Sequence, residues 1–286
     1  MRVGFIGLGR MGSGLARNLV TSGYSLGVYD VSPAAVARLV EAGANEATSA
    51  RALAQESDVL FTSLPLPSDV ESVLLGETGC ASVMPPDATV IDVSTIDPQS
   101  ARRIADAITS SGRHFLACPL GKGPAQAAEG TEPIFAGGPR DVFDRCRQIL
   151  EAIGKPVYYL GDVEQSTAFK LVSNLVGLTN MAVLAEGLAI SMKAGIEMGQ
   201  LRELLGDTGA DSYQLRLRGP WVLHEDYTPR FSVDLTAKDL RLAVAMARAM
   251  GVEPQIGAIA LNLYTQAQAE GYGAEDAAAV FKLLRP

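Results

Sequence analysis

The stretch VGFIGLGRMG, residues 3–12, places a short apolar run directly before three spaced glycines. A helical pattern of apolar residues, GLARNLVTSGY, follows it, so strand, tight turn and helix come in the order that a dinucleotide-binding fingerprint requires. In such a turn Gly7 makes the bend, Gly9 lets the backbone approach a pyrophosphate, and Gly12 lets helix and strand pack closely. We therefore predict dinucleotide binding at this end; the alternative is a glycine-rich turn without a ligand.

An acidic residue follows at the position that a ribose requires. Asp30 ends the next apolar run, 23 residues after Gly7, where a carboxylate can accept hydrogen bonds from both ribose hydroxyls. The same carboxylate would repel the 2′-phosphate of NADP, and the next two residues, Val31 and Ser32, include no arginine. The sequence therefore favours NAD over NADP; the alternative is that Asp30 only caps a turn.

Seven β-rich runs between residue 1 and about residue 160 alternate with helical stretches, which predicts a largely parallel sheet covered by helices. The runs are RVGFIGL, SLGVYD, VLFTSL, TVIDVS, HFLACP, PIFAGG and PVYYLG. From Glu164 onward such runs stop, and apolar residues at helical spacing on both flanks predict a long, well-buried helix. We predict an α/β fold in which residues 1–161 form a Rossmann-type, doubly wound NAD-binding domain and residues 162–286 an all-helical domain.

The composition narrows the classes of partner. A net charge of −8 without a basic stripe argues against nucleic acid and favours a small molecule or a second copy of the chain. Cys80, Cys118 and Cys146 show no metal-ligand spacing, so we expect no metal site and a reducing cytosol. We expect no signal-peptide cleavage site and no apolar stretch of about 20 residues, and hence a cytoplasmic protein without a membrane partner.

Polar groups follow two further strands of the predicted sheet. Ser63-Leu64-Pro65 comes after VLFT, and Asp92-Val93-Ser94-Thr95 comes after TVI. Ligands of open α/β sheets bind beyond the carboxyl ends of the strands, so hydroxyls and amides here can hold a ribose, a nicotinamide amide or a substrate acid group. Either cluster alone is also compatible with a helix cap.

The stretch STAFKLVSN offers a candidate acid/base group at the start of the long helix. Ser173 and Asn174 stand three and four residues after Lys170, so all three polar groups can face one side of the helix. An ammonium there can donate a proton to a carbonyl oxygen, and an amine can take one from an alcohol. The alternative is a lysine whose charge extends into water. A later pair, Lys238-Asp239, is either a surface ion pair or a lysine that reaches the cofactor.

The loop CPLGKG, residues 118–123, carries a lone cation between two glycines. Lys122 can neutralise an anion that the flexible backbone at Gly121 and Gly123 approaches, or it can be a solvated turn residue.

Taken together, these residues resemble the β-hydroxyacid dehydrogenase family, which includes 3-hydroxyisobutyrate dehydrogenases and tartronate semialdehyde reductases. The resemblance runs through nearly the whole chain and rests on FIGLGRMGSGLARNL, DVSTIDP, Gly130-Thr131, FKLVSN and AKDLRLA. It implies an NAD(P)-binding domain, a long helix, an all-helical domain for substrate binding and dimerisation, and a homodimer or homotetramer. Its implied substrate is a small anionic hydroxy acid or semialdehyde.

The resemblance also assigns roles to individual residues. It implies that Lys170 is the catalytic acid/base and that Asn174 helps to hold the substrate. The implied cofactor-binding residues are Gly7, Gly9, Arg10, Met11, Gly12, Asp30, Leu64, Pro65, Thr95 and Lys238. The implied substrate-binding residues are Ser94, Gly121, Lys122, Gly123, Ser173 and Asn174.

Two departures from the family pattern bear on the substrate. Gly121 stands where the family usually has a serine that binds the substrate carboxylate, and Ser173 stands where it usually has a first asparagine. Lys122 falls on the position of an arginine that recognises a sulfonate in a branch resembling sulfolactaldehyde reductases. A lysine is a point charge rather than a planar fork, so both carboxylate and sulfonate substrates remain open.

Two other functions compete with an NAD-dependent hydroxy-acid dehydrogenase. Imine reductases resemble this fold but generally carry another residue at the position of Lys170. Non-catalytic dinucleotide-binding modules arise among related chains when this lysine is lost. The presence of Lys170 therefore favours hydride transfer between a hydroxy acid and its semialdehyde.

Overall fold

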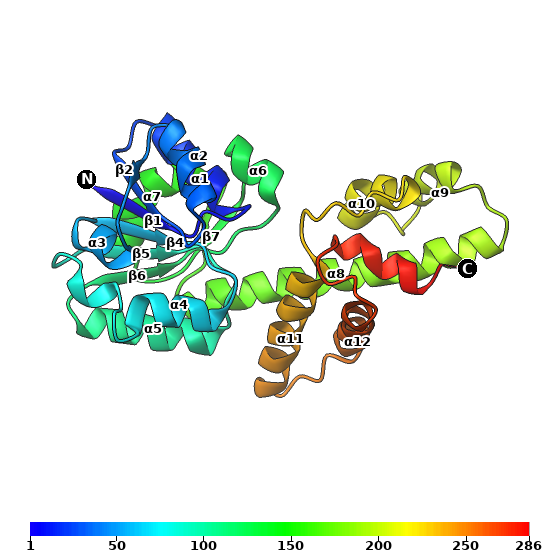
Figure 1. Ribbon diagram of the computed structural model, residues 1–286. Coiled ribbons are helices and arrows are strands. Elements are labelled where there is room, and N and C mark those ends of the chain that lie inside the picture. Colours follow the sequence, from blue (N-terminus) through cyan, green and yellow to red (C-terminus); the bar gives the residue numbers. More distant parts are fainter. Residues whose placement is uncertain (286) are drawn as a thin grey trace. The chain divides into compact units, whose positions relative to one another are not determined.

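The computed structural model of the protein describes residues 1–285 and contains two compact units, Met1–Lys170 and a second that begins at Leu171. The first unit holds a six-stranded sheet with every pair parallel, in the order β3-β2-β1-β4-β5-β6 (Figure 1). Its strands are β1 (Val3–Ile6), β2 (Leu26–Tyr29), β3 (Asn45–Glu46), β4 (Val59–Thr62), β5 (Thr89–Asp92) and β6 (His114–Ala117). The predicted doubly wound sheet is confirmed.

Helices cover both faces of this sheet, as Figure 1 shows. The first face carries α1 (Gly12–Thr21), α2 (Pro33–Glu41) and α7 (Arg140–Ile153), with α6 (Pro124–Glu129) packed on α1. The second face carries α3 (Ala50–Gln55), α4 (Pro67–Leu75) and α5 (Pro98–Ser110). Successive strand residues point to opposite faces, so Phe61 belongs to the first core and Leu60 to the second. Burial on both faces explains why these strands are continuous apolar runs.

Two features of the sheet differ from the sequence prediction. The edge strand β3 was not predicted, because its two residues are polar and exposed and give no hydrophobic signal. The runs PIFAGG and PVYYLG do form strands, β7 (Ile134–Ala136) and β8 (Val157–Tyr159), but these pair with each other in a separate parallel sheet.

The second unit contains helices joined by loops, and no strand is found among its described residues. It contains most of α8 (Val163–Lys193), followed by α9 (Met198–Gly206), α10 (Tyr213–Leu223), α11 (Val233–Ala249), α12 (Gln255–Ala269) and a 3-10 helix (Ala277–Leu283). A buried ion pair joins Arg218 to Asp276 at 2.9 Å, and the same carboxylate accepts the backbone amides of Arg230 and Phe231. The predicted domain boundary after residue 161 lies just before α8, and the compact units divide within that helix.

The helix α8 is long, as predicted, but its burial differs from the prediction. Val172, Val176, Val183 and Ile190 are 48–69% exposed and recur at intervals of four and seven residues, so they form one apolar row along the helix. The opposite side is buried, for example at Leu171 and Leu178. The prediction of a well-buried helix is therefore wrong for this row, because the described residues cover only one of the two apolar flanks.

The expectation that no apolar stretch reaches membrane length is also corrected. Within residues 1–285, α8 is the one helix long and apolar enough to cross a membrane by length and composition, with a mean hydropathy of 1.6 in its most apolar window. Core helices pass the same test, so this property assigns no membrane to the protein.

Candidate active site

The glycine turn, residues 7–12, lies between the end of β1 and the start of α1. Gly7 has φ +92°, and a Cβ there would lie 2.3 Å from the carbonyl oxygen of Ser63. A Cβ at Gly12 would lie 2.0 Å from the carbonyl oxygen of Gly7, whereas a Cβ at Gly9 would meet no atom within 4 Å. The fold itself therefore requires Gly7 and Gly12 but leaves the space at Gly9 open, as close approach of a ligand phosphate to the backbone demands.

Asp30 holds the glycine turn from the neighbouring strand. Its Oδ2 accepts the backbone amide of Leu8 at 2.6 Å, and its Oδ1 accepts the amide of Ser32, at the start of α2, at 2.7 Å. Asp30 is half-buried, and each carboxylate oxygen has a second lone pair. Asp30 therefore caps this turn, as the alternative expects, and each of its carboxylate oxygens keeps a lone pair that can accept a ribose hydroxyl.

All the other predicted nucleotide contacts except Lys238 belong to the first unit. Arg10 is exposed and Met11 half-buried at the start of α1. Leu64 and Pro65 follow β4, the strand next to β1, and Thr95 follows β5. Because the carboxyl ends of parallel strands meet at one edge of a sheet, these residues lie on the same side of the unit as the glycine turn.

Ser94 is engaged inside the protein. It is 5% exposed; its hydroxyl donates to Asp92 Oδ1 at 2.6 Å and accepts the amide of Leu64 at 2.9 Å. Thr62 donates to the same Asp92 oxygen at 2.8 Å. Ser94 thus links the loop after β4 to the loop after β5, and its one hydroxyl proton is already used, so only acceptor capacity is left for a substrate.

The loop 118–123 runs antiparallel to the segment that leads into β7. The amide of Gly121 donates to the carbonyl of Pro133 at 2.9 Å, and the amide of Phe135 donates to the carbonyl of Pro119 at 3.0 Å. This pairing sets Glu132 opposite Lys122, and the backbone amide of Lys122 donates to Glu132 Oε1. The side chain of Lys122 is exposed, while Gly121 and Gly123 are half-buried.

Glu132 is a buried carboxyl group at this loop and is not among the predicted site residues. Its side chain is fully buried, and burial raises its pKa to about 7. The amides of Lys122 and Gly121 and the charges of Lys170 and Lys122 oppose that rise. No motif marks Glu132, which becomes a neighbour of Lys122 only through the antiparallel pairing.

Lys170 lies in the first two turns of α8 with only 7% of its surface exposed. Such burial does not fit the alternative of a lysine whose charge extends into water. Ser173 and Asn174 follow on the same helix and are both half-buried.

A buried polar cluster of the second unit contains two predicted residues and one that the prediction left out. Asn174 Nδ2 donates to Asp239 Oδ2 at 2.5 Å, and Lys238 Nζ lies 2.8 Å from Asp239 Oδ1. The side chains of Lys238 and Asp239 are 13% and 2% exposed, so the pair is not a surface ion pair. Asp239 thus ties α8 to α11, and its place directly after Lys238 was the only sequence signal for it.

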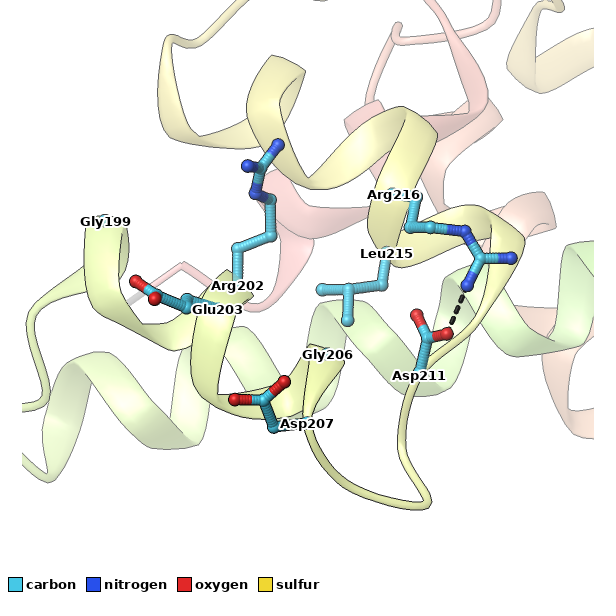
Figure 2. A pocket seen from close by; sticks show the side chains of 8 residues that line it. All are labelled: Gly199, Arg202, Glu203, Gly206, Asp207, Asp211, Leu215 and Arg216. Carbon is cyan, nitrogen blue, oxygen red and sulfur yellow. Dashed lines mark hydrogen bonds and ion pairs between the residues drawn. The ribbon is translucent and has the colours of Figure 1, made fainter.

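A hollow of about 630 Å³ lies elsewhere, between α9 and α10 (Figure 2). It is lined by Gly199, Arg202, Glu203, Gly206, Asp207, Asp211, Leu215 and Arg216, none of which is a predicted site residue. Figure 2 shows Asp211 paired with Arg216, and most of the other lining side chains are exposed. This hollow is therefore separate from the candidate chemistry. Residues 1–285 contain no cluster of three or more side chains that could hold a metal ion.

Comparisons with known proteins cover the whole chain. Residues 2–161 match the NAD binding domain of 6-phosphogluconate dehydrogenase, and residues 165–284 match the NAD-binding region of NADP-dependent 3-hydroxyisobutyrate dehydrogenase. A 3-hydroxyisobutyrate dehydrogenase of Pseudomonas aeruginosa is 35% identical, over 99% of this chain and 98% of that protein. A 3-sulfolactaldehyde reductase of Escherichia coli is 33% identical, over 99% and 95%.

The fold comparison agrees with these similarities. A crystal structure of 3-hydroxyisobutyrate dehydrogenase from Salmonella typhimurium matches with a TM-score of 0.92 at 33% identity, over 99% of each chain. The resemblance inferred from the motifs is confirmed along both units.

Proposed function

Since this chain belongs to the β-hydroxyacid dehydrogenase family, we propose that it uses NAD to interconvert a short 3-hydroxy acid and its semialdehyde, with Lys170 as the general acid and base. Family membership makes the protein an oxidoreductase that acts on a CH–OH group. The observation that carries the assignment of Lys170 is its burial, at 7% exposure, close enough to Glu132 at the loop 118–123 for their charges to interact.

The glycine turn and Asp30 would hold the dinucleotide. The open space at Gly9 suits a pyrophosphate, and the carboxylate oxygens of Asp30 suit the ribose hydroxyls while repelling a 2′-phosphate. Met11, Leu64, Pro65, Thr95 and Lys238, with Arg10, complete the proposed cofactor-binding set. A dinucleotide held there would supply hydride transfer between the alcohol carbon of the hydroxy acid and the aldehyde carbon of its semialdehyde.

The remaining step is a proton transfer by this chain. In the oxidation, the neutral amine of Lys170 takes the proton of the substrate hydroxyl; in the reduction, its ammonium donates a proton to the carbonyl oxygen. Asn174, held by Asp239, would orient the substrate through its amide, with Ser173 beside it on α8.

We assign the acid group of the substrate to the loop 118–123. Lys122 projects an exposed ammonium from that loop, and Gly123 begins the approach to α6. Gly121 would lie at the same acid group, whereas Ser94, whose hydroxyl keeps only acceptor capacity, would face the substrate hydroxyl. A lysine accommodates a carboxylate or a sulfonate, so both classes of short anionic hydroxy acid are proposed as substrates.

We also propose that the protein works as a homodimer or homotetramer in the cytoplasm. The exposed row Val172, Val176, Val183 and Ile190 on α8 supports self-association, because an uncovered apolar strip of this length is typical of an interface.

A panel of aldehydes tests the function. NADH oxidation is measured with three-carbon and four-carbon semialdehydes that carry a carboxylate, a sulfonate or no charge, and with a cyclic imine. We expect turnover of at least one anionic semialdehyde, whereas turnover of the imine alone would establish the imine reductase alternative. No turnover of any compound, together with tight NADH binding, would favour a non-catalytic module.

Two variants test the residue roles. Lys170→Ala should lower kcat by about 10³-fold, since general acid and base catalysis contributes factors of about 10² to 10⁴. Lys122→Ala should raise the KM of the anionic substrate by about tenfold and leave the KM of NADH unchanged. Full turnover by Lys170→Ala would overturn the acid/base assignment, and equal changes in both KM values would overturn the anion site.

A further inference from the structure

Glu132 is a buried ionisable residue beside the loop 118–123 whose chemistry the proposed function leaves unused. It stands three residues after Glu129, yet Glu129 is exposed and Glu132 is fully buried. A carboxyl group is buried at a cost of several kcal/mol unless other groups compensate it. Its retention in the core of the first unit therefore calls for partners that need a carboxylate.

The first such partner is the loop 118–123. Glu132 Oε1 accepts the amide of Lys122, and the amide of Gly121 also acts on the carboxyl group. The amide of Lys122 is thus bonded to this side chain, while the neighbouring amide of Gly121 is bonded to the carbonyl of Pro133. A carboxylate binds amides more strongly than a neutral acceptor does, so Glu132 fixes this loop against the segment before β7.

The second partner is Lys170. Its charge stabilises the ionised form of Glu132, and by the same interaction the carboxylate stabilises the ammonium form of Lys170. The charged groups that act on Glu132 are Lys122 from the loop and Lys170 from α8. On the side of α7 it meets the backbone near Gly154.

We propose that Glu132 is a positioning residue of the active site: it fixes the loop 118–123 through the amide of Lys122, and its carboxylate sets the protonation of Lys170. The proposal rests on the proposed role of Lys170. Glu132 touches neither substrate nor reacting atoms, and it acts through the other two residues. Its ionised form favours the ammonium that the reduction needs; its neutral form releases the amine that the oxidation needs.

The variant Glu132→Gln tests the charge, because it keeps the shape and an oxygen acceptor for the amide of Lys122. The pH dependence of kcat/KM is measured in both directions. Removal of the negative charge should shift the alkaline limb of the reduction and the acidic limb of the oxidation to lower pH by about one unit. KM at the optimum should change less than about threefold, because the loop keeps its acceptor.

A measurement without turnover gives an independent answer. Lys170 in the enzyme without cofactor is labelled with a trace of acetic anhydride across a pH series, and its modification is quantified by mass spectrometry. The midpoint of labelling should move to lower pH by about one unit in Glu132→Gln. The exposed Glu129→Gln is the matched control and should leave both limbs and the labelling midpoint unchanged.

Further outcomes separate this inference from the proposed function. Glu132→Ala should raise the substrate KM about tenfold through loss of the loop anchor, without changing the KM of NADH. If neither the pH profile of kcat/KM nor the labelling midpoint of Lys170 shifted in Glu132→Gln, the inference about Glu132 would be overturned. The proposed function would still be supported in that case, provided that Lys170→Ala is inactive. Should the glutamine variant not fold, Glu132→Leu, which buries no polar group, carries the same predicted shifts.

Discussion

In both the glycine turn and the loop 118–123 a carboxylate accepts a backbone amide of the loop, but the two carboxylates differ in solvent exposure. Each follows a strand of one parallel sheet, and in each a carboxylate accepts a backbone amide of the loop, from Leu8 to Asp30 and from Lys122 to Glu132. Asp30 is half-buried at the end of the neighbouring strand, whereas Glu132 is fully buried. The first anchor keeps lone pairs accessible to a ligand, and the second is confined to holding the protein's own groups.

The largest effect is expected where the glycine turn tolerates no side chain. In Gly12→Ala the added Cβ would lie 2.0 Å from the carbonyl oxygen of Gly7, and neither backbone can yield without opening the turn. We expect NADH affinity to fall by more than about 100-fold and the free energy of unfolding to fall by about 3 kcal/mol. Fluorescence titration of NADH and urea unfolding measure the two effects.

Gly9→Ala is the matched control, because its Cβ meets no protein atom within 4 Å. It should leave the free energy of unfolding unchanged within about 0.5 kcal/mol and still weaken NADH binding, since only the ligand approaches that position. If Gly12→Ala and Gly9→Ala lowered the free energy of unfolding equally, the fold itself would require a glycine at position 9, and the separation proposed here between a structural glycine and a ligand-contacting glycine would be wrong.

The second-largest effect is expected at Glu132, where the free energy of unfolding should depend on pH. Burial raises the pKa of Glu132 from its ordinary value of 4.5 to about 7, so the folded state binds a proton that the unfolded state has lost between these values. The stability of the native protein therefore falls as pH rises from about 4.5 to 7, and stays lowered above that. Glu132→Gln removes this loss and should be more stable than the native protein by up to about 3 kcal/mol at pH 8, with no gain at pH 4.5.

Urea unfolding of both proteins at the two pH values measures this difference. Glu129→Gln serves as the control, because an exposed carboxyl group titrates alike in the folded and unfolded chains. A stability difference between Glu132→Gln and the native protein that is independent of pH would contradict the buried-anchor account.

The difference between Asp30 and Glu132 also explains which parts of the fold and of the candidate site the sequence could predict. The sheet, its helices and the glycine turn follow from local signals, because each apolar run is only a few residues long and the three spaced glycines and Asp30 lie within residues 7–30. The edge strand β3 escaped prediction because Asn45 and Glu46 bury nothing. The exposed row on α8 escaped because periodicity identifies an apolar face without identifying what covers it.

Glu132 and the contact between Asp239 and Asn174 escaped prediction for a different reason. Glu132 contacts Lys122, ten residues earlier in the chain, through an antiparallel pairing that no sequence spacing predicts. Asp239 contacts Asn174, which lies 65 residues earlier. Buried polar contacts of this kind depend on the packed fold, so local sequence signals do not predict them. The predicted roles of Lys170, Lys122 and Asn174 stay predictions until the variants are measured.

The third effect concerns the accessible anchor. Asp30→Ala removes the acceptor of two backbone amides and, in the proposed function, of the ribose hydroxyls. NAD affinity should fall about tenfold, and NADP affinity should fall less or rise, because the repulsion of the 2′-phosphate is gone. Parallel titrations with NADH and NADPH measure the ratio. An unchanged preference for NADH would remove the argument for NAD specificity from Asp30.

The smallest effect is expected at the loop 118–123, where the chain has glycine in place of the family's usual serine. In Gly121→Ser the new Cβ would lie 3.0 Å from the ring of Phe135 and 3.1 Å from Pro133, so the neighbours must yield by a few tenths of an ångström. The ring of Phe135 is itself packed against Phe169 at 4.6 Å between ring centroids, which resists that movement. We expect urea unfolding to show a loss of about 1 kcal/mol.

The double variant Gly121→Ser with Phe135→Leu decides the cause of this loss. A smaller side chain at 135 gives the new Cβ room, so the serine should cost less in the Phe135→Leu background than in the native one. An equal cost in both backgrounds would place the strain in the loop backbone instead of the ring. In the first case Phe135, rather than the demands of a substrate, accounts for the glycine at position 121, and a carboxylate substrate remains as compatible with this loop as a sulfonate.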